Sequence, residues 1–223
     1  RHWGILGKRQ EGLLRTAPPL FQEVYVPVYC RERVQIQHKE IIIVRDFYQS
    51  NERNTMYTFI DLFAGIGGFR TALEKKGMKC VFSSDIDEKA QEAYFKNFGE
   101  TPKGDITEIH EKKIPSHDIL CAGFPCQSFS ISGQSKGFDD DRGRLFYEIV
   151  RIANYHQPHV LLLENVKNIL TIDNGSVIKT IEAKLDEIGY TLNKHVLNAS
   201  YFGIPQSRER VYFVALRKHG KTK

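Results

Sequence analysis

The chain of 223 residues has a globular composition, with 41% hydrophobic and 26% charged residues. That balance excludes wholesale disorder, and no run approaches the ~18 consecutive apolar residues of a membrane span. The net charge of +5 is uneven, since residues 203–223 hold six Lys or Arg against one Glu. The centre of the chain is mildly acidic, so charge alone does not indicate a self-sufficient nucleic-acid binder.

The cysteines and the N-terminal residues indicate the cellular compartment. The four cysteines show no paired spacing, which favours a reduced protein. Residues 1–12 place charges and glycines where a secretory leader has its apolar core. We therefore expect a cytoplasmic protein with no membrane partner. The eight histidines do not cluster like ligands, so we expect no metal site.

Residues 1–56 differ in character from the rest of the chain. They contain Pro18, Pro19 and Pro27 and two runs with strand-like composition, residues 24–30 and 35–48. They hold no internal repeat and no chemical motif. We expect an N-terminal extension of unknown role, followed by the main domain over residues 57–223.

From Tyr57 onward, short apolar runs alternate with segments of helical spacing. In the last of these segments, Val177, Ile181 and Leu185 fall on one helical face. The alternation predicts a Rossmann-like α/β fold, with a mostly parallel sheet covered by helices on both faces and an antiparallel edge hairpin. The expected strands are 57–64, 79–86, 118–124, 159–166, 191–199 and 210–217, and the expected helices are 68–76, 88–98, 144–157 and 176–188.

The first strand leads into a glycine-rich turn, AGIGGFR, that is suited to close approach of a ligand. Asp85 lies 20 residues after Gly65, at the end of the second strand, where a carboxylate can accept hydrogen bonds from a ribose diol. Asp105, at the end of an expected third strand in KGDIT, would reach an adenine amino group. The pattern predicts a nucleoside-containing cofactor and leaves NAD and S-adenosylmethionine open.

Cys126 follows the apolar run 118–124 and Pro125, which places a thiol at the mouth of the sheet. A structural cysteine more often lies within such a run, as Cys121 does. The residues after it, 127–143, are rich in glycine and small polar side chains. We expect them to form a mobile lid rather than a plain surface loop.

Five motifs occur in order over residues 57–217: DLFAGIGGF, GDI, GFPCQSFSISGQSKGF, LLLENV and QSRERVYFV. In these motifs the chain resembles the DNA (cytosine-5) methyltransferases. The resemblance implies S-adenosylmethionine as cofactor and double-stranded DNA as substrate, with the target cytosine flipped out of the helix. It also implies a bacterial-type enzyme of the kind that serves restriction–modification.

The same resemblance implies the residues of the cofactor site. Phe63 would stack on the adenine ring, Asp85 would hold the ribose hydroxyls, and Gly65 would approach the methionine portion. Gly123 and Leu145 would line the other side of the cofactor. The full implied set is Phe63, Gly65, Ile66, Gly68, Asp85, Ile86, Asp105, Ile106, Gly123, Pro125 and Leu145.

The resemblance also implies the catalytic residues. Cys126 would attack cytosine C6, which makes C5 nucleophilic enough to take a methyl group. Glu164, in its protonated form, would hydrogen-bond N3 and stabilise the charge that develops during attack. Arg208 and Arg210 would complete the base pocket, with Arg210 donating to O2 and favouring the thiolate.

Two other classes of enzyme also act on cytosine. A zinc deaminase would need Cys-x-x-Cys after the proline, but position 129 is Phe, which excludes that class. An RNA cytosine-5 methyltransferase of the transfer-RNA type remains open, because the same catalytic residues serve both substrates.

The family pattern continues past QSRERV into a target-recognition region and a late Asn-containing motif, whereas this chain stops at Lys223. We therefore expect a fragment, or one subunit of a split enzyme, that needs a second polypeptide carrying the recognition part. The alternative is a fragment that binds cofactor and is inactive alone.

Overall fold

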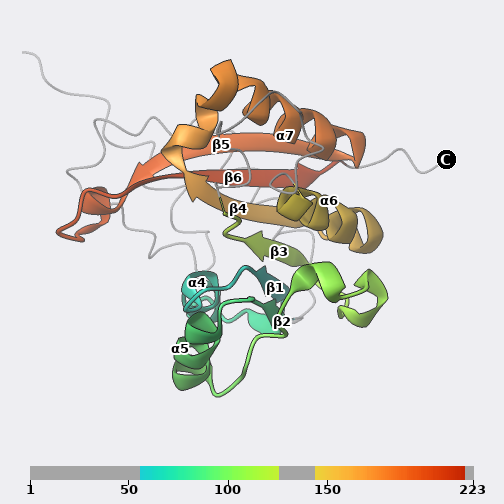
Figure 1. Ribbon diagram of the computed structural model, residues 1–223, viewed down its shortest axis with the longest axis vertical. Helices are drawn as coiled ribbons and strands as arrows, with labels where there is room; N and C mark the ends of the chain where they lie inside the picture. Colours follow the sequence, from blue (N-terminus) through green and yellow to red (C-terminus); the bar gives the residue numbers. More distant parts are fainter. Residues whose placement is uncertain (1–55, 126–143, 219–223) are drawn as a thin grey trace, which may run out of the picture. The chain divides into compact units, whose positions relative to one another are not determined.

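The computed structural model describes residues 56–125 and 144–218, and these form one sheet of six strands in the order β2-β1-β3-β4-β6-β5 (Figure 1). β1, β2, β3 and β4 run parallel, while β6 is antiparallel to both β4 and β5. The predicted mostly parallel sheet with an antiparallel edge hairpin is thus confirmed. The strands are β1 Thr58–Leu62, β2 Lys79–Ser84, β3 Ile119–Ala122, β4 Val160–Val166, β5 Tyr190–Asn198 and β6 Glu209–Arg217.

The helices of the described residues begin and end close to their predicted positions. Asp87 caps α5, because its Oδ1 accepts a hydrogen bond from the Ala90 amide at 2.8 Å, and Gly99 ends the helix with a φ of 71°. The α-helices are α4 Gly68–Glu74, α5 Glu88–Phe98, α6 Arg144–His156 and α7 Ser176–Glu187. Short 3₁₀ segments are η2 Ile106–Glu108, η3 Glu111–Lys113, η5 Lys167–Leu170, η6 Ile172–Gly175 and η7 Ala199–Phe202.

The expected third strand ending at Asp105 is wrong. The residues between α5 and β3 contain no strand, and Asp105 instead caps η2, with its Oδ1 accepting from the Thr107 amide at 2.8 Å. Pro102 cannot donate to a ladder, and Gly104 has a φ of 77°, so the segment turns where a strand would have to continue. The Lys103 amide bonds to the end of β2, at the Ser83 carbonyl.

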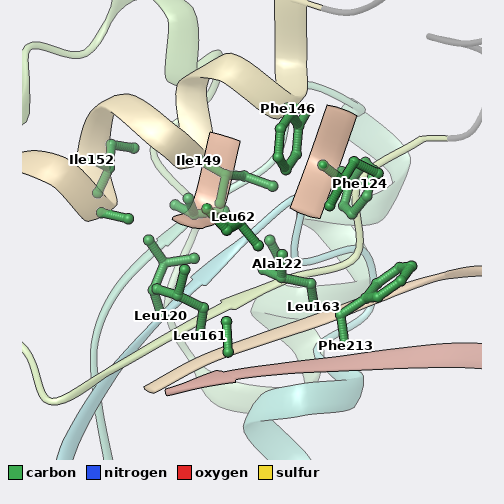
Figure 2. Close-up of a cluster of buried hydrophobic side chains, with 14 of the residues drawn as sticks. Leu62, Leu120, Ala122, Phe124, Phe146, Ile149, Ile152, Leu161, Leu163 and Phe213 are labelled. Carbon is green, nitrogen blue, oxygen red and sulfur yellow. The ribbon is translucent and has the colours of Figure 1, made fainter. Parts of the chain in front are cut away.

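Alternating side chains divide the core between the two faces of the sheet. One face packs against α6 and α7, and Figure 2 shows Phe146, Ile149 and Ile152 of α6 above the strand residues. The strand residues of this face are Ile60, Leu62, Leu120, Ala122, Leu161, Leu163, Val211, Phe213 and Ala215. The opposite face carries Phe59 and Cys121, which pack with Phe69 and Leu73 of α4.

Ile149 and Ile152 lie on the buried face of α6. Both isoleucines are fully buried, but Leu145 is only partly buried and Phe146 fills the position beside Phe124. Among the described residues, no helix has the length and apolar character needed to span a bilayer.

Candidate active site

Three parallel strands end together at the candidate site. Phe63 follows β1, Gly123 follows β3, and Glu164 lies near the end of β4. A Cβ atom added at Gly123 would lie 3.6 Å from Glu164 Oε2 and 3.9 Å from the Phe63 carbonyl oxygen. The structure therefore brings these three predicted residues together at the carboxyl edge of the sheet, where open α/β folds bind ligands.

The glycine-rich loop after β1 turns sharply. Phe63, Gly65 and Gly67 have φ values of 55°, 56° and 87°, and the non-glycine Phe63 in this region indicates local strain. Added Cβ atoms at Gly65 or Gly68 would meet nothing within 4 Å. The loop backbone is consequently open to a ligand at these two predicted positions, while the exposed Ile66 side chain lies between them in sequence.

Asp85 links the loop to the end of β2. Its Oδ2 accepts a hydrogen bond from the Gly65 amide at 2.7 Å, and its Oδ1 accepts one from the Asp87 amide at 2.9 Å. The carboxylate is thereby fixed beside the loop, and each oxygen keeps a lone pair for a further donor. The adjacent Ile86 side chain is 70% exposed, so it offers an apolar surface to a stacking ligand.

Asp105 and Ile106, the other residues implied for the adenine pocket, differ in burial. Asp105 is partly buried at the start of η2, whereas the Ile106 side chain is 3% exposed and belongs to the core facing α6. Arg151 of α6 fixes this segment by donating to the Ile106 carbonyl at 3.2 Å and to the Ile109 carbonyl at 2.9 Å.

Glu164 and Arg210 form an ion pair, with Arg210 Nε 2.9 Å from Glu164 Oε1. The strand register explains it, because Glu164 lies opposite Tyr212 and Val166 opposite Arg210, which makes the pair diagonal neighbours on one face. Both side chains keep about a fifth to a quarter of their surface exposed, at 24% and 22%. Burial raises the pKa of the neighbouring Tyr212, and the Glu164 charge adds to that shift.

Arg208 is exposed in the connection between β5 and β6. Its backbone amide donates to Asn198 Oδ1 at 3.0 Å, and its carbonyl accepts from the Ala199 amide at 3.0 Å. Its charge partly opposes the rise that burial causes in the pKa of Tyr212, which lies opposite Glu164 in the sheet. Arg208 is two residues from Arg210 in the chain, but among the described residues no hydrogen bond or ion pair joins its side chain to the Glu164–Arg210 pair.

Cys126 and the expected lid 127–143 lie outside the described residues, and Pro125 is the last described residue before them. Asn165 was missed in the sequence. Its Nδ2 donates to the Phe124 carbonyl at 2.9 Å, and its side chain is 2% exposed, so it fixes the backbone that leads to Cys126. The signal was a lone amide within an apolar strand, which needs a buried partner.

Asp61 of β1 was also missed. It is 1% exposed, and neither carboxylate oxygen has a hydrogen-bond partner among the described residues. Burial raises its pKa to about 8, and the charge of Arg70 only partly opposes this. A carboxyl group in an apolar run, directly before the glycine-rich turn, was the signal in the sequence.

Fold and site together define a Rossmann-like α/β domain whose open glycine loop and carboxylate–guanidinium pair lie at the same sheet edge. The model of the C-5 cytosine-specific DNA methylase family matches residues 57–223. The chain belongs to that family.

The chain is similar to several curated bacterial enzymes. It is 55% identical over 159 residues to Type II methyltransferase M.HhaI of Haemophilus parahaemolyticus, a match that covers 71% of this chain and 49% of that enzyme. It is 52% identical over 167 residues to Type II methyltransferase M.HpaII of Haemophilus parainfluenzae, covering 73% and 46%. The chain thus spans about half the length of the curated relatives it matches.

Solved structures agree with the fold. The S. pombe Dnmt2 methyltransferase aligns with a TM-score of 0.60 at 28% identity, covering 75% of this chain and 52% of that one. The Entamoeba histolytica methyltransferase EhMeth aligns with a TM-score of 0.63 at 28% identity, covering 76% and 56%.

Proposed function

We propose that this chain is the cofactor-binding and catalytic half of an enzyme that transfers a methyl group from S-adenosylmethionine to C5 of a flipped-out cytosine in double-stranded DNA. The observation that carries the proposal is the Glu164–Arg210 pair beside Gly123, at the edge of the sheet that also holds the glycine loop. The family description, C-5 cytosine-specific DNA methylase, favours DNA over RNA as the substrate.

The residues around the glycine loop fit S-adenosylmethionine. Gly65 and Gly68 leave open space along the loop, and Asp85 presents a fixed carboxylate to a ribose diol. Phe63 and the exposed Ile86 would bound the adenine, with Asp105 accepting from its amino group. When bound, the cofactor supplies the methyl group as an electrophile on a sulfonium centre.

Glu164 and Arg210 have complementary roles toward a cytosine ring. The ring edge presents an amino donor at N4 and acceptors at N3 and O2. Once it takes up a proton, Glu164 donates to N3 and accepts from N4, while Arg210 donates to O2. The hydrogen bonds donated to N3 and O2 strengthen as negative charge moves onto the ring during attack at C6, which is the requirement for transition-state stabilisation.

Cys126 is the proposed nucleophile. Its thiolate forms a bond to C6, the electron pair shifts toward N3, and C5 becomes able to attack the methyl donor. After methylation, C5 loses its proton to solvent and the C6–S bond breaks, which restores the ring and the thiolate. Asn165 supports this step by fixing the Phe124 carbonyl two residues before the thiol.

We further propose that a polypeptide outside this chain chooses the target cytosine. The support is that the matched relatives are about twice as long as their match to this chain.

DNA containing 5-fluorocytosine tests the proposed mechanism, because fluorine at C5 cannot leave after methyl transfer and the covalent adduct persists. The chain is incubated with this DNA and S-adenosylmethionine, with and without the polypeptide that completes the relatives' length. We expect a denaturant-resistant adduct that disappears in Cys126→Ser. An adduct that persists in Cys126→Ser would contradict the assignment of the nucleophile.

A further inference from the structure

The glycine loop also contacts the last turn of α5. Asn97 Nδ2 donates to the Ile66 carbonyl oxygen at 3.1 Å, joining residues 31 positions apart. Figure 1 shows α4, which begins in this loop, next to α5 at the β1–β2 end of the sheet. The bond fixes a loop carbonyl that lies between the two open glycines, Gly65 and Gly68.

Phe98, the next residue of α5, closes the space behind Gly67. A Cβ atom added at Gly67 would lie only 2.1 Å from Phe98 Cε2 and 2.7 Å from its Cζ. Gly67 also has a φ of 87°, which side-chain-bearing residues rarely adopt. The ring and the loop backbone therefore pack in direct contact, and Gly67 is the residue that allows it.

Phe98 is itself held by two neighbouring side chains. The Arg70 guanidinium lies 4.6 Å from its ring centroid, and the Tyr94 ring centroid lies at 4.7 Å. Arg70 is in turn fixed by Glu74 at 2.8 Å and Glu100 at 2.7 Å. The ring thus has little freedom to move away from Gly67.

We propose that Asn97 and Phe98 are positioning residues for the cofactor, holding the backbone of Ile66 and Gly67 in the conformation that binds S-adenosylmethionine. The inference rests on the proposed function. Both side chains act through the loop backbone, so their loss makes the loop less ordered before binding. Binding must then supply that ordering, and affinity falls while the bound geometry is retained.

Calorimetric titration of the full chain with S-adenosylhomocysteine measures this effect. Asn97→Ala is expected to raise Kd about fivefold, the effect of one lost hydrogen bond. Asn97→Asp, which has the same shape but no N–H donor, should raise Kd further because its carboxylate faces the Ile66 carbonyl. Asn97→Gln keeps the donor and should recover part of the affinity. Phe98→Leu should also weaken binding.

The matched control is Lys96→Ala, one residue earlier on the same helix. Lys96 is exposed and pairs only with Glu92 in the described contacts of α5, so Kd should equal that of the unmodified chain. Thermal unfolding of every variant separates loss of affinity from loss of fold. If Asn97→Ala, Asn97→Asp and Phe98→Leu bind as tightly as the unmodified chain, the inference is overturned while the proposed function stands. If the unmodified chain binds no S-adenosylhomocysteine, the proposed function fails, and the inference with it.

Discussion

At the scale of single residues, the Glu164–Arg210 pair makes the most specific prediction about chemistry. Glu164→Gln keeps an N–H group that donates to cytosine N3, but the amide cannot transfer a proton to N3. We expect the single-turnover methylation rate to fall about 100-fold, the usual contribution of a positioned acid or base, with little change in DNA affinity. Quenched single-turnover assays with labelled S-adenosylmethionine measure the rate. An unchanged rate would show that Glu164 takes no part in proton transfer.

Asp61 makes a prediction about stability and pH. Its pKa is raised by burial to about 8, so the folded state retains a proton that the unfolded state loses near pH 4. The free energy of unfolding should therefore decrease as pH rises from about 5 to about 8. Asp61→Asn keeps the shape without the titration, so its profile should be flatter. Parallel profiles from urea unfolding of the two proteins would contradict this account.

At the scale of elements, substitutions at two adjacent glycines at the start of α4 distinguish an effect on stability from an effect on ligand binding. Gly67→Ala meets the Phe98 ring at 2.1 Å and has a strained φ, so it should cost about 1–3 kcal/mol of stability. Gly68→Ala meets nothing within 4 Å and lies in the helix, so its stability should hold or rise by up to about 1 kcal/mol. It should nevertheless weaken cofactor binding. Unchanged binding by Gly68→Ala would place the cofactor elsewhere.

Elements with clear periodicity could be predicted from the sequence, including the six strands and the amphipathic α7 with Val177, Ile181 and Leu185. The strand expected at Asp105 failed because Pro102 and Gly104 interrupt the extended backbone just before it. Asn165 was missed because its hydrogen-bond partner, the Phe124 carbonyl, is distant in sequence. Asp61 was missed because its burial without a hydrogen-bond partner among the described residues also depends on segments distant in sequence.

At the scale of the whole molecule, the strand order brings the glycine loop, the strand that leads to Cys126 and the Glu164–Arg210 pair to one edge of the sheet. Segments from residue 63 to residue 210 thereby meet, although the chain spans about half of its curated relatives. We expect cofactor binding to need only this chain, and base-specific methylation to need the rest of the polypeptide. Adding that polypeptide in trans should lower the KM for DNA far more than the Kd for S-adenosylhomocysteine.

The most direct test of the central claim is the identity of the methylated nucleoside. Duplex DNA is incubated with the chain, the completing polypeptide and methyl-labelled S-adenosylmethionine, digested to nucleosides, and separated by chromatography with mass detection. The account predicts label only in 5-methyldeoxycytidine, and none when Cys126→Ser is used. Label in N4-methyldeoxycytidine or N6-methyldeoxyadenosine, or in transfer RNA supplied as competitor but not in DNA, would contradict it.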